Sequence, residues 1–194
     1  TDDIIVTGHT DGRVRRWRIP DLQLIESVHP HRGGVRAVAY HAPTQRYASS
    51  GHDGAVYVWR QGEPVRALTA PPTDARDLAF TPDGARLYGA SWFKVFRWDL
   101  ADGALTIQNT EHRGIITSID MSADGRRLAT ISRETDSAVQ ILDTATGTPL
   151  VRFQSHELCG GYVQLSPGER FLATTSDDAT VRVWDLAELS AGVP

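Results

Sequence analysis

Hydrophobic and polar residues alternate by twos in five short segments that recur along the chain. Each segment has Val three places before its last residue, and four of the five end in Trp. The segments are Val14-Arg15-Arg16-Trp17, Val56-Tyr57-Val58-Trp59, Val95-Phe96-Arg97-Trp98, Val139-Gln140-Ile141-Leu142 and Val181-Arg182-Val183-Trp184. β-branched and aromatic residues at period two predict strands rather than helices. The last positions are spaced by 42, 39, 44 and 42 residues, which indicates an internal repeat.

Each repeat contains further segments that predict strands. One lies upstream, at 35–40, 75–80, 115–121 and 162–165; a second ends in small residues, as in Tyr47-Ala48-Ser49; another lies downstream, at 24–28, 65–68, 105–108 and 150–153. Tight turns such as Thr81-Pro82-Asp83-Gly84 precede the small-residue strand. Pro fixes φ in such a turn and Gly supplies the left-handed position. The repeating unit is therefore predicted to be a four-stranded antiparallel meander.

Repeats of this length that end in Trp98-Asp99 or Trp184-Asp185 resemble the WD-repeat family. The resemblance covers essentially the whole chain. It implies an all-β fold, a β-propeller of four-stranded antiparallel blades, with about four and a half blades present. We expect residues 1–194 to form a single propeller region with approximate repeats at 1–28, 29–70, 71–109, 110–154 and 155–194. The first repeat lacks its innermost strand and the fifth lacks an evident outermost one.

The resemblance also implies a structural tetrad in each blade, in which His, a hydroxyl residue, Asp and Trp satisfy one another's hydrogen bonds. Complete sets occur in the second and fifth repeats: His31, Ser49, Asp53 and Trp59, and His156, Thr174, Asp178 and Trp184. Partial sets are Thr7, Asp11 and Trp17 in the first repeat, and His112, Thr130 and Asp136 in the fourth, where Leu142 replaces Trp. The third repeat has lost the set: Ala70, Tyr88 or Gly89, and Trp92 stand at the His, hydroxyl and Asp positions.

A hydroxyl residue with His and Asp is also the composition of a hydrolase triad. A catalytic set is needed once, whereas this set recurs at one spacing, which favours a structural role. We therefore predict no catalytic residues and no enzyme activity. The pair in His29-Pro30-His31 has no third ligand nearby, so no metal site is expected. No phosphate loop or dinucleotide motif occurs, and no cofactor is predicted.

Composition narrows the choice of partners. The chain has 24 acidic and 20 basic residues, a net charge of -4, which argues against nucleic acid and acidic membranes. No apolar run approaches the 18 residues of a membrane span. A single cysteine, Cys159, favours a reducing, cytoplasmic location. The basic residues are 19 Arg and one Lys, which suggests a GC-rich and therefore bacterial genome.

Protein partners are expected at the loop-rich rim, the usual recognition surface of the family. The candidate contacts are the turn residues Thr10, His52, Ser91, Thr135 and Asp177, together with Trp92 and Phe93. Two adjacent aromatics in one turn supply rigid apolar area of the kind that anchors protein interfaces. In the alternative, Trp92 folds inward and fills the space of the missing His and Asp. The alternative is favoured, because large aromatic side chains are on average more often buried.

These observations predict a non-catalytic scaffold for protein–protein interactions, a docking or sensor part of a larger bacterial regulatory protein. The alternative is a propeller enzyme or small-molecule binder that uses the channel mouth. It is disfavoured because strand starts such as Gly33-Gly34-Val35 and Gly114-Ile115-Ile116 offer small and apolar groups. A structural role in a large assembly is a third interpretation.

An open ring would expose the strand Ile4-Ile5-Val6 as an unpaired apolar edge, which proteins avoid. We expect the ring to be completed by further blades of a parent chain or by a second copy. The first is preferred because two copies would exceed the common range of 4 to 8 blades.

Overall fold

The chain folds into five antiparallel sheets that follow one another in sequence order. A computed structural model describes residues 4–134 and 136–190. Within that range the sheets have three, four, four, four and three strands. The predicted fold class, an all-β propeller of four-stranded antiparallel blades in which the first and last are incomplete, is confirmed.

The strands lie close to their predicted positions. The first sheet contains β1 (Ile4–Gly8), β2 (Val14–Arg18) and β3 (Gln23–Val28); the second contains β4 (Val35–His41), β5 (Arg46–Gly51), β6 (Val56–Arg60) and β7 (Arg66–Ala67). The third contains β8 (Asp77–Phe80), β9 (Arg86–Ser91), β10 (Lys94–Asp99) and β11 (Leu105–Asn109). The fourth contains β12 (Ile115–Met121), β13 (Arg127–Arg133), β14 (Ala138–Asp143) and β15 (Pro149–Gln154), and the fifth β16 (Gly160–Leu165), β17 (Phe171–Ser176) and β18 (Val181–Asp185). A short helix, α1 (Leu186–Ser190), follows β18 and was not expected from the sequence.

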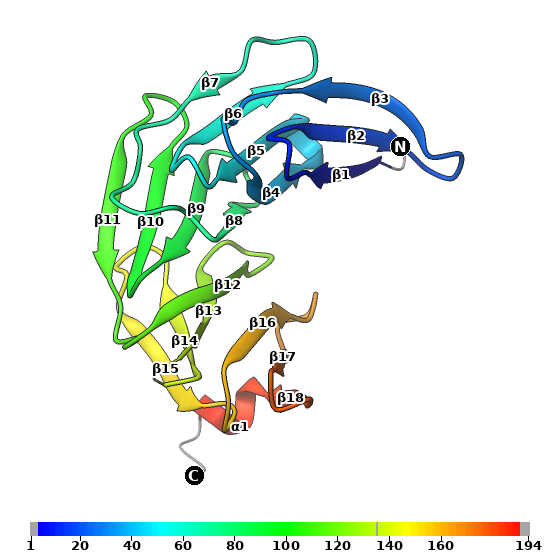
Figure 1. Ribbon diagram of the computed structural model, residues 1–194. Helices are drawn as coiled ribbons and strands as arrows, with labels where there is room; N and C mark the ends of the chain where they lie inside the picture. Colours follow the sequence, from blue (N-terminus) through cyan, green and yellow to red (C-terminus); the bar gives the residue numbers. More distant parts are fainter. Residues whose placement is uncertain (1–3, 135, 191–194) are drawn as a thin grey trace.

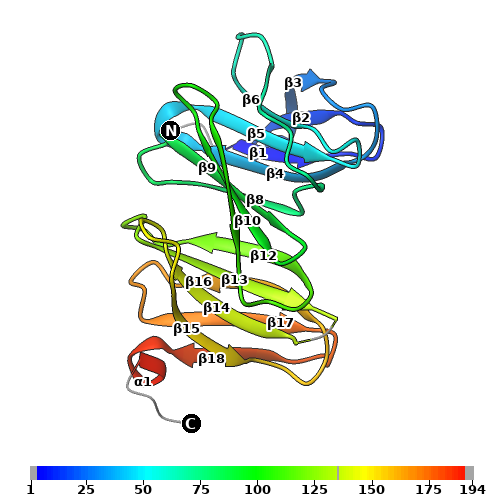
Figure 2. The ribbon, with the colours of Figure 1, turned by 90° about the vertical axis from the view of Figure 1, so that its left-hand side faces the viewer.

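The five sheets are arranged around an arc (Figure 1). The strands β4, β8, β12 and β16 lie on its inner side, and β7, β11 and β15 lie on its outer side. Seen from the side, the sheets succeed one another from the first to the fifth (Figure 2). The first and fifth sheets therefore form the two ends of the arc, and each of the three middle sheets has a neighbour on both faces.

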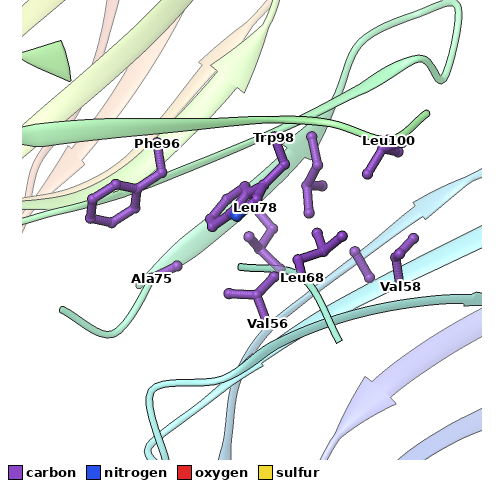
Figure 3. Packing of buried hydrophobic residues seen from close by; sticks show 10 residues of the cluster. Val56, Val58, Leu68, Ala75, Leu78, Phe96, Trp98 and Leu100 are labelled. Atoms are coloured by element: carbon purple, nitrogen blue, oxygen red, sulfur yellow. The ribbon is translucent and has the colours of Figure 1, made fainter. Parts of the chain in front are cut away.

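The hydrophobic core is divided among the contacts between neighbouring sheets. Between the second and third sheets, for example, Val56 and Val58 face Leu78 and Trp98 (Figure 3). Separate clusters fill the other three contacts. Successive side chains of a strand point to opposite faces, and in the middle sheets both sets include buried apolar residues, so both faces are covered.

Half-buried carboxylates on the inner strands join neighbouring sheets. The Oδ2 atom of Asp77 in β8 accepts hydrogen bonds from the Ile119 N–H at 2.9 Å and from the Ser118 hydroxyl at 3.0 Å, both in β12. The Oδ2 atom of Asp120 accepts from the Leu165 N–H in β16 at 2.7 Å. Burial raises the pKa of both carboxyl groups, although these hydrogen bonds act in the opposite direction.

The outward face of the fifth sheet is apolar and exposed. Leu172 and Val163 pack against the fourth sheet, whereas Val181 and Val183 of the same sheet lie on its open side. The first sheet likewise exposes apolar side chains, including Ile5 and Leu24. In the middle sheets both faces are covered, so these two faces are the apolar surfaces that the described part of the arc leaves open.

Candidate functional site

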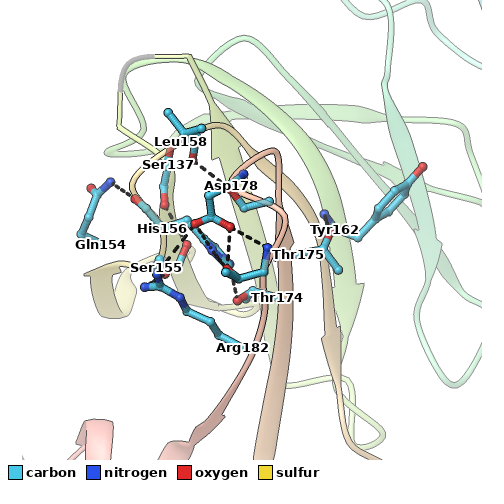
Figure 4. A network of polar contacts seen from close by, with 12 residues as sticks. Ser137, Gln154, Ser155, His156, Leu158, Tyr162, Thr174, Thr175, Asp178 and Arg182 are labelled. Carbon is cyan, nitrogen blue, oxygen red and sulfur yellow. Dashed lines mark hydrogen bonds and ion pairs between the residues drawn. The ribbon is translucent and has the colours of Figure 1, made fainter.

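The polar network of the fifth sheet joins four side chains through one hydroxyl group. The Nε2 atom of His156 lies 2.8 Å from Thr174 Oγ1, and its Nδ1 lies 3.0 Å from Asp178 Oδ2 (Figure 4). The indole N–H of Trp184 donates to the same Thr174 oxygen at 3.0 Å. The network ties the loop before β16 to the turn between β17 and β18, as the WD-repeat resemblance implies.

In the second sheet the network has three members rather than four. His31 contacts Asp53 through Nδ1 at 2.9 Å and Ser49 through Nε2 at 2.8 Å. The expected hydrogen bond from Trp59 is not formed, because its ring stacks on Tyr47, with centroids 5.8 Å apart, in the cluster toward the first sheet. Its Nε1 is buried without a hydrogen-bond partner among the described residues.

The fourth sheet keeps only part of the network. His112 Nε2 lies 2.8 Å from Thr130 Oγ1, but its Nδ1 is 3.7 Å from Asp136, beyond hydrogen-bonding distance. Asp136 instead accepts from the Ser132 hydroxyl and, at 3.0 Å, from Arg152. The carboxylate of the fourth repeat thus has partners outside the tetrad.

In the first sheet a histidine missed by sequence reasoning replaces the tetrad histidine. Thr7 Oγ1 accepts from the Trp17 indole N–H at 2.8 Å, and His9 Nε2 lies 2.8 Å from the same oxygen. Asp11 does not join them, since its carboxylate bonds the Arg13 N–H at 3.0 Å and Arg15 at 2.7 Å. The signal for His9 was its place two residues after Thr7, within the turn.

In the third sheet, side-chain packing and a backbone hydrogen bond take the place of the missing tetrad. Gly89 pairs with Phe96 across β9 and β10, as Ser49 pairs with Tyr57 in the second sheet, so Gly89 occupies the hydroxyl position. A side chain there would press on the ring of Trp98, which is fully buried. The Trp98 indole N–H donates to the Thr69 carbonyl oxygen at 2.9 Å. A backbone acceptor therefore replaces the missing hydroxyl.

The carboxylates of these networks are held in their charged form. Hydrogen bonds from the hydroxyl and N–H groups of Thr180, with His156 beside them, keep the pKa of Asp178 well below its usual range. Burial opposes ionisation of Asp136, but His112, the Ser132 hydroxyl and the Arg113 N–H outweigh it and lower its pKa.

The hydroxyl groups of these networks are poorly placed for nucleophilic catalysis. Ser49, Thr130 and Thr174 are fully buried, and each is already engaged with a histidine. Among residues 4–134 and 136–190, no group of three or more His, Cys, Asp or Glu side chains is arranged to hold a metal ion. The arrangement satisfies buried polar groups and holds loops to the sheets.

The candidate contact residues of the rim are not all accessible. Thr10, His52 and Asp177 are exposed, in the turns that follow β1, β5 and β17. Ser91 is fully buried, and its hydroxyl has no partner in the described part of the chain, so it cannot serve as a contact. Thr135 lies outside the described residues.

Trp92 and Phe93 point outward, contrary to the favoured expectation for Trp92. Their side chains are 38% and 41% exposed, and the rings meet edge to face with centroids 5.9 Å apart. The space beside Gly89 is filled by the ring of Trp98 instead. The Phe93 N–H donates to the Gly114 carbonyl oxygen, and its own carbonyl accepts from the Thr110 N–H at 2.8 Å.

The mouth of the arc also differs from the expectation of small and apolar groups. Arg36 stands one residue into β4, and Arg76 directly precedes β8. Both side chains line a hollow between the inner strands. Sequence reasoning weighed strand starts such as Gly33-Gly34-Val35 and missed these two arginines, although each is the second residue of a predicted strand, at 35–40 and 75–80.

Two segments of the chain match a known family of repeats. Residues 22–60 and 147–185 match the family model described as WD domain, G-beta repeat. Each matched segment begins near the outermost strand of one sheet and ends at the third strand of the next. The sequence repeat is therefore offset by one strand from the sheet.

The relatives are longer than this chain. The chain is 29% identical over 167 residues to the Target of rapamycin complex subunit wat1 of Schizosaccharomyces pombe, which covers 82% of this chain and 53% of the relative. It is 24% identical over 228 residues to the Ribosome biogenesis protein WDR12 homolog of Chlamydomonas reinhardtii, an alignment that covers 95% of this chain and 51% of the relative. It is 23% identical over 201 residues to Striatin-4 of Homo sapiens, with 93% of this chain and 27% of the relative covered. The chain thus spans about half or less of the length of these relatives.

Proposed function

We propose that the chain is a non-catalytic WD-repeat scaffold that binds protein partners through its rim. The rim comprises the turns between β1 and β2, β5 and β6, β9 and β10, β13 and β14, and β17 and β18, with the adjoining starts of the inner strands. The observation that carries the proposal is the exposed pair of Trp92 and Phe93, called the aromatic pair below.

The aromatic pair has the properties of an interface anchor. Its turn is held to the fourth sheet by the bond from Phe93 N–H to Gly114 and by a β-bridge between Trp92 and Ile115. A partner would therefore meet two large rings that lose little freedom on binding, which raises affinity for a given contact area.

Two observations support a non-catalytic role. The hydroxyl, His and Asp side chains that resemble a triad are buried and satisfy one another. The relatives named above are described as a complex subunit, a ribosome biogenesis protein and a striatin, names that denote no enzyme activity. Fold alone does not decide function, so the proposal depends on these site contacts.

Further blades are proposed to cover the open faces of the end sheets. Val181 and Val183 in the fifth sheet and Leu24 in the first are exposed where the middle sheets are packed. A sheet face of this kind is suited to a neighbouring blade. The mass of the purified chain, measured by light scattering after size exclusion, tests this. A stable monomer with a cooperative melt would oppose it, and a defined dimer would assign the faces to a second copy.

We place the scaffold in a larger regulatory protein of the cytoplasm. The single cysteine supports a reducing compartment, and no helix among the described residues is long and apolar enough to cross a membrane. The excess of Arg over Lys is the basis for a bacterial source, whereas the relatives named above are eukaryotic and give that source no support.

The rim proposal is tested by chemical crosslinking and capture with three purified forms. They are the wild type, the double variant Trp92→Ala/Phe93→Ala, and a control, Ile107→Ala/Leu150→Ala, which removes two exposed apolar side chains of the outer strands β11 and β15. We expect the wild type and the control to capture proteins that the rim variant does not capture. Equal capture by all three forms would contradict the proposal.

A further inference from the structure

A hollow of about 580 Å³ opens where the inner strands of the second to fifth sheets begin. Arg36 and Arg76 line it from the second and third sheets, and Arg133 lines it from the end of β13. Tyr162 of β16 completes the wall with an exposed ring. Three arginines from three sheets therefore line one space.

The three arginines differ in their partners. The Nε atom of Arg36 lies 3.2 Å from Asp74 Oδ2, and Arg133 Nη2 lies 3.2 Å from Asp177 Oδ2. Arg76 forms no ion pair with a carboxylate in the described part of the chain. Its Nε, like that of Arg36, is buried without a hydrogen-bond partner there. A buried donor without an acceptor is costly. Arg76 is thus the one of these three arginines that lacks a carboxylate partner among the described residues, and a ligand anion would supply one.

We propose that this hollow binds an acidic segment of a partner protein, with a carboxylate or phosphoryl group at Arg76 and with Arg36 and Arg133 beside it. The inference rests on the proposed scaffold function and adds the chemistry of the partner. Guanidinium groups bind planar or tetrahedral oxyanions through paired N–H donors, which gives both orientation and strength.

The carboxylates near the hollow leave room for such a ligand. Asp77 is turned toward the fourth sheet, where the Ser118 hydroxyl and the Ile119 N–H occupy its Oδ2. Asp177 is exposed, and an exposed ion pair contributes little stability, so a ligand can displace it from Arg133. Asp74 pairs with Arg36 at a half-buried position, and a ligand can displace it from Arg36 in the same way.

Charge explains why Arg76 attracts an anion. Burial and the neighbouring charges of Arg36 and Arg133 lower the pKa of Arg76, while Asp74 and Glu134 act in the opposite direction. The guanidinium stays protonated at neutral pH, so its positive charge persists within the hollow. A peptide is favoured over nucleic acid because the whole chain carries a net charge of -4, which repels an extended polyanion.

The test is fluorescence anisotropy with labelled peptides of one length. The probes are a Gly-Ser peptide containing four Glu residues, the same peptide with Gln in their place, and the same peptide with two phosphoserines. A labelled oligothymidylate of equal length tests the nucleic-acid alternative. The proteins are the wild type, Arg76→Ala, Asp177→Asn and the control Arg126→Ala, whose side chain is 85% exposed in the turn before β13. Circular dichroism melts confirm that each variant is folded.

The Glu or phosphoserine peptide is expected to bind, and the Gln peptide is not. Arg76→Ala should weaken binding about tenfold, since a charge-assisted pair is lost. Asp177→Asn should tighten it two- to threefold by freeing Arg133, a gain that loss of structure cannot produce. Arg126→Ala should leave it unchanged, and added salt should weaken it.

Equal affinity for the Glu and Gln peptides, or full binding by folded Arg76→Ala, would overturn the assignment. Tighter binding of the oligothymidylate would overturn it in favour of nucleic acid. If acidic peptides fail while Trp92→Ala/Phe93→Ala still loses captured proteins, the hollow is wrongly assigned and the scaffold proposal stands. If capture does not depend on the aromatic pair, the scaffold proposal itself fails.

Discussion

The guanidinium of Arg16 in the first sheet donates a hydrogen bond of 2.8 Å to the phenol oxygen of Tyr47 in the second. Arg16 is only 4% exposed, and its nearest carboxylate, Glu26, is 3.7 Å away within its own sheet. The charged side chain is therefore accommodated by a neutral oxygen across the contact between two sheets. A buried arginine would be costly without such a partner.

Removing the Tyr47 hydroxyl should weaken the contact between the first two sheets. Tyr47→Phe is expected to lower the free energy of unfolding by about 1–2 kcal/mol, because the Arg16 donor loses its acceptor. In an Arg16→Ala background the same change should have almost no effect, which a double-mutant cycle in urea measures. Tyr162→Phe is the control, since that ring is 71% exposed. Equal losses in both backgrounds would show that the two side chains are not coupled.

The same phenol should make stability fall at alkaline pH. Burial is the main cause that raises the pKa of Tyr47 from 10.0 to about 12, although the charge of Arg16 acts against it. The folded state then keeps a proton that the unfolded state loses above pH 10, so this contribution is complete below pH 10 and is lost as the pH rises toward 12. Unfolding free energies measured in urea across this range should fall less steeply in Tyr47→Phe than in Tyr162→Phe. Identical slopes would contradict the assignment.

The hydroxyl of Thr174 should matter more than that of Thr130. Thr174 accepts from the Trp184 indole and contacts His156, whereas Thr130 contacts His112 without any indole. Thr174→Val keeps the shape but leaves two buried polar groups unpaired, so a loss of about 2–4 kcal/mol is expected. Thr130→Val should lose about half as much on the same basis. Chemical denaturation of both variants tests this, and a larger loss for Thr130→Val would refute it.

The strands could be predicted because their signal is local. The run Val56-Tyr57-Val58-Trp59 is apolar without interruption, which is typical of a strand whose two faces both meet a neighbouring sheet, and Asp-Gly turns mark the ends. Since each sheet is formed by consecutive strands, no long-range pairing had to be guessed. This is why the number and order of the strands agreed with the structure.

The polar site was less predictable because it depends on how sheets pack. Trp59 and Trp184 occupy the same place in the sequence repeat, yet only Trp184 reaches its hydroxyl, since Trp59 stacks on Tyr47 instead. Trp92 is exposed, and it is the fully buried ring of Trp98 that lies beside Gly89. The hollow around Arg76 is lined by residues of other sheets, and the spacing of residues within one repeat does not predict such neighbours.

A single turn position should respond in opposite ways in two sheets. Ala179 follows Asp178 with φ of +62°, and Gly54 follows Asp53 in the equivalent turn with φ of +76°. A left-handed backbone destabilises an L-residue by about 1–2 kcal/mol relative to glycine. Part of this advantage of glycine is offset because glycine gives the unfolded chain more conformational freedom. Ala179→Gly should therefore raise the free energy of unfolding by about 0.5–1 kcal/mol, and Gly54→Ala should lower it by a similar amount. A Cβ at Gly54 would meet nothing within 4 Å, so steric clash does not contribute. Urea midpoints with unchanged slopes measure both effects, and a loss of stability in Ala179→Gly would show that neighbouring contacts, not φ, decide the conformation of this turn.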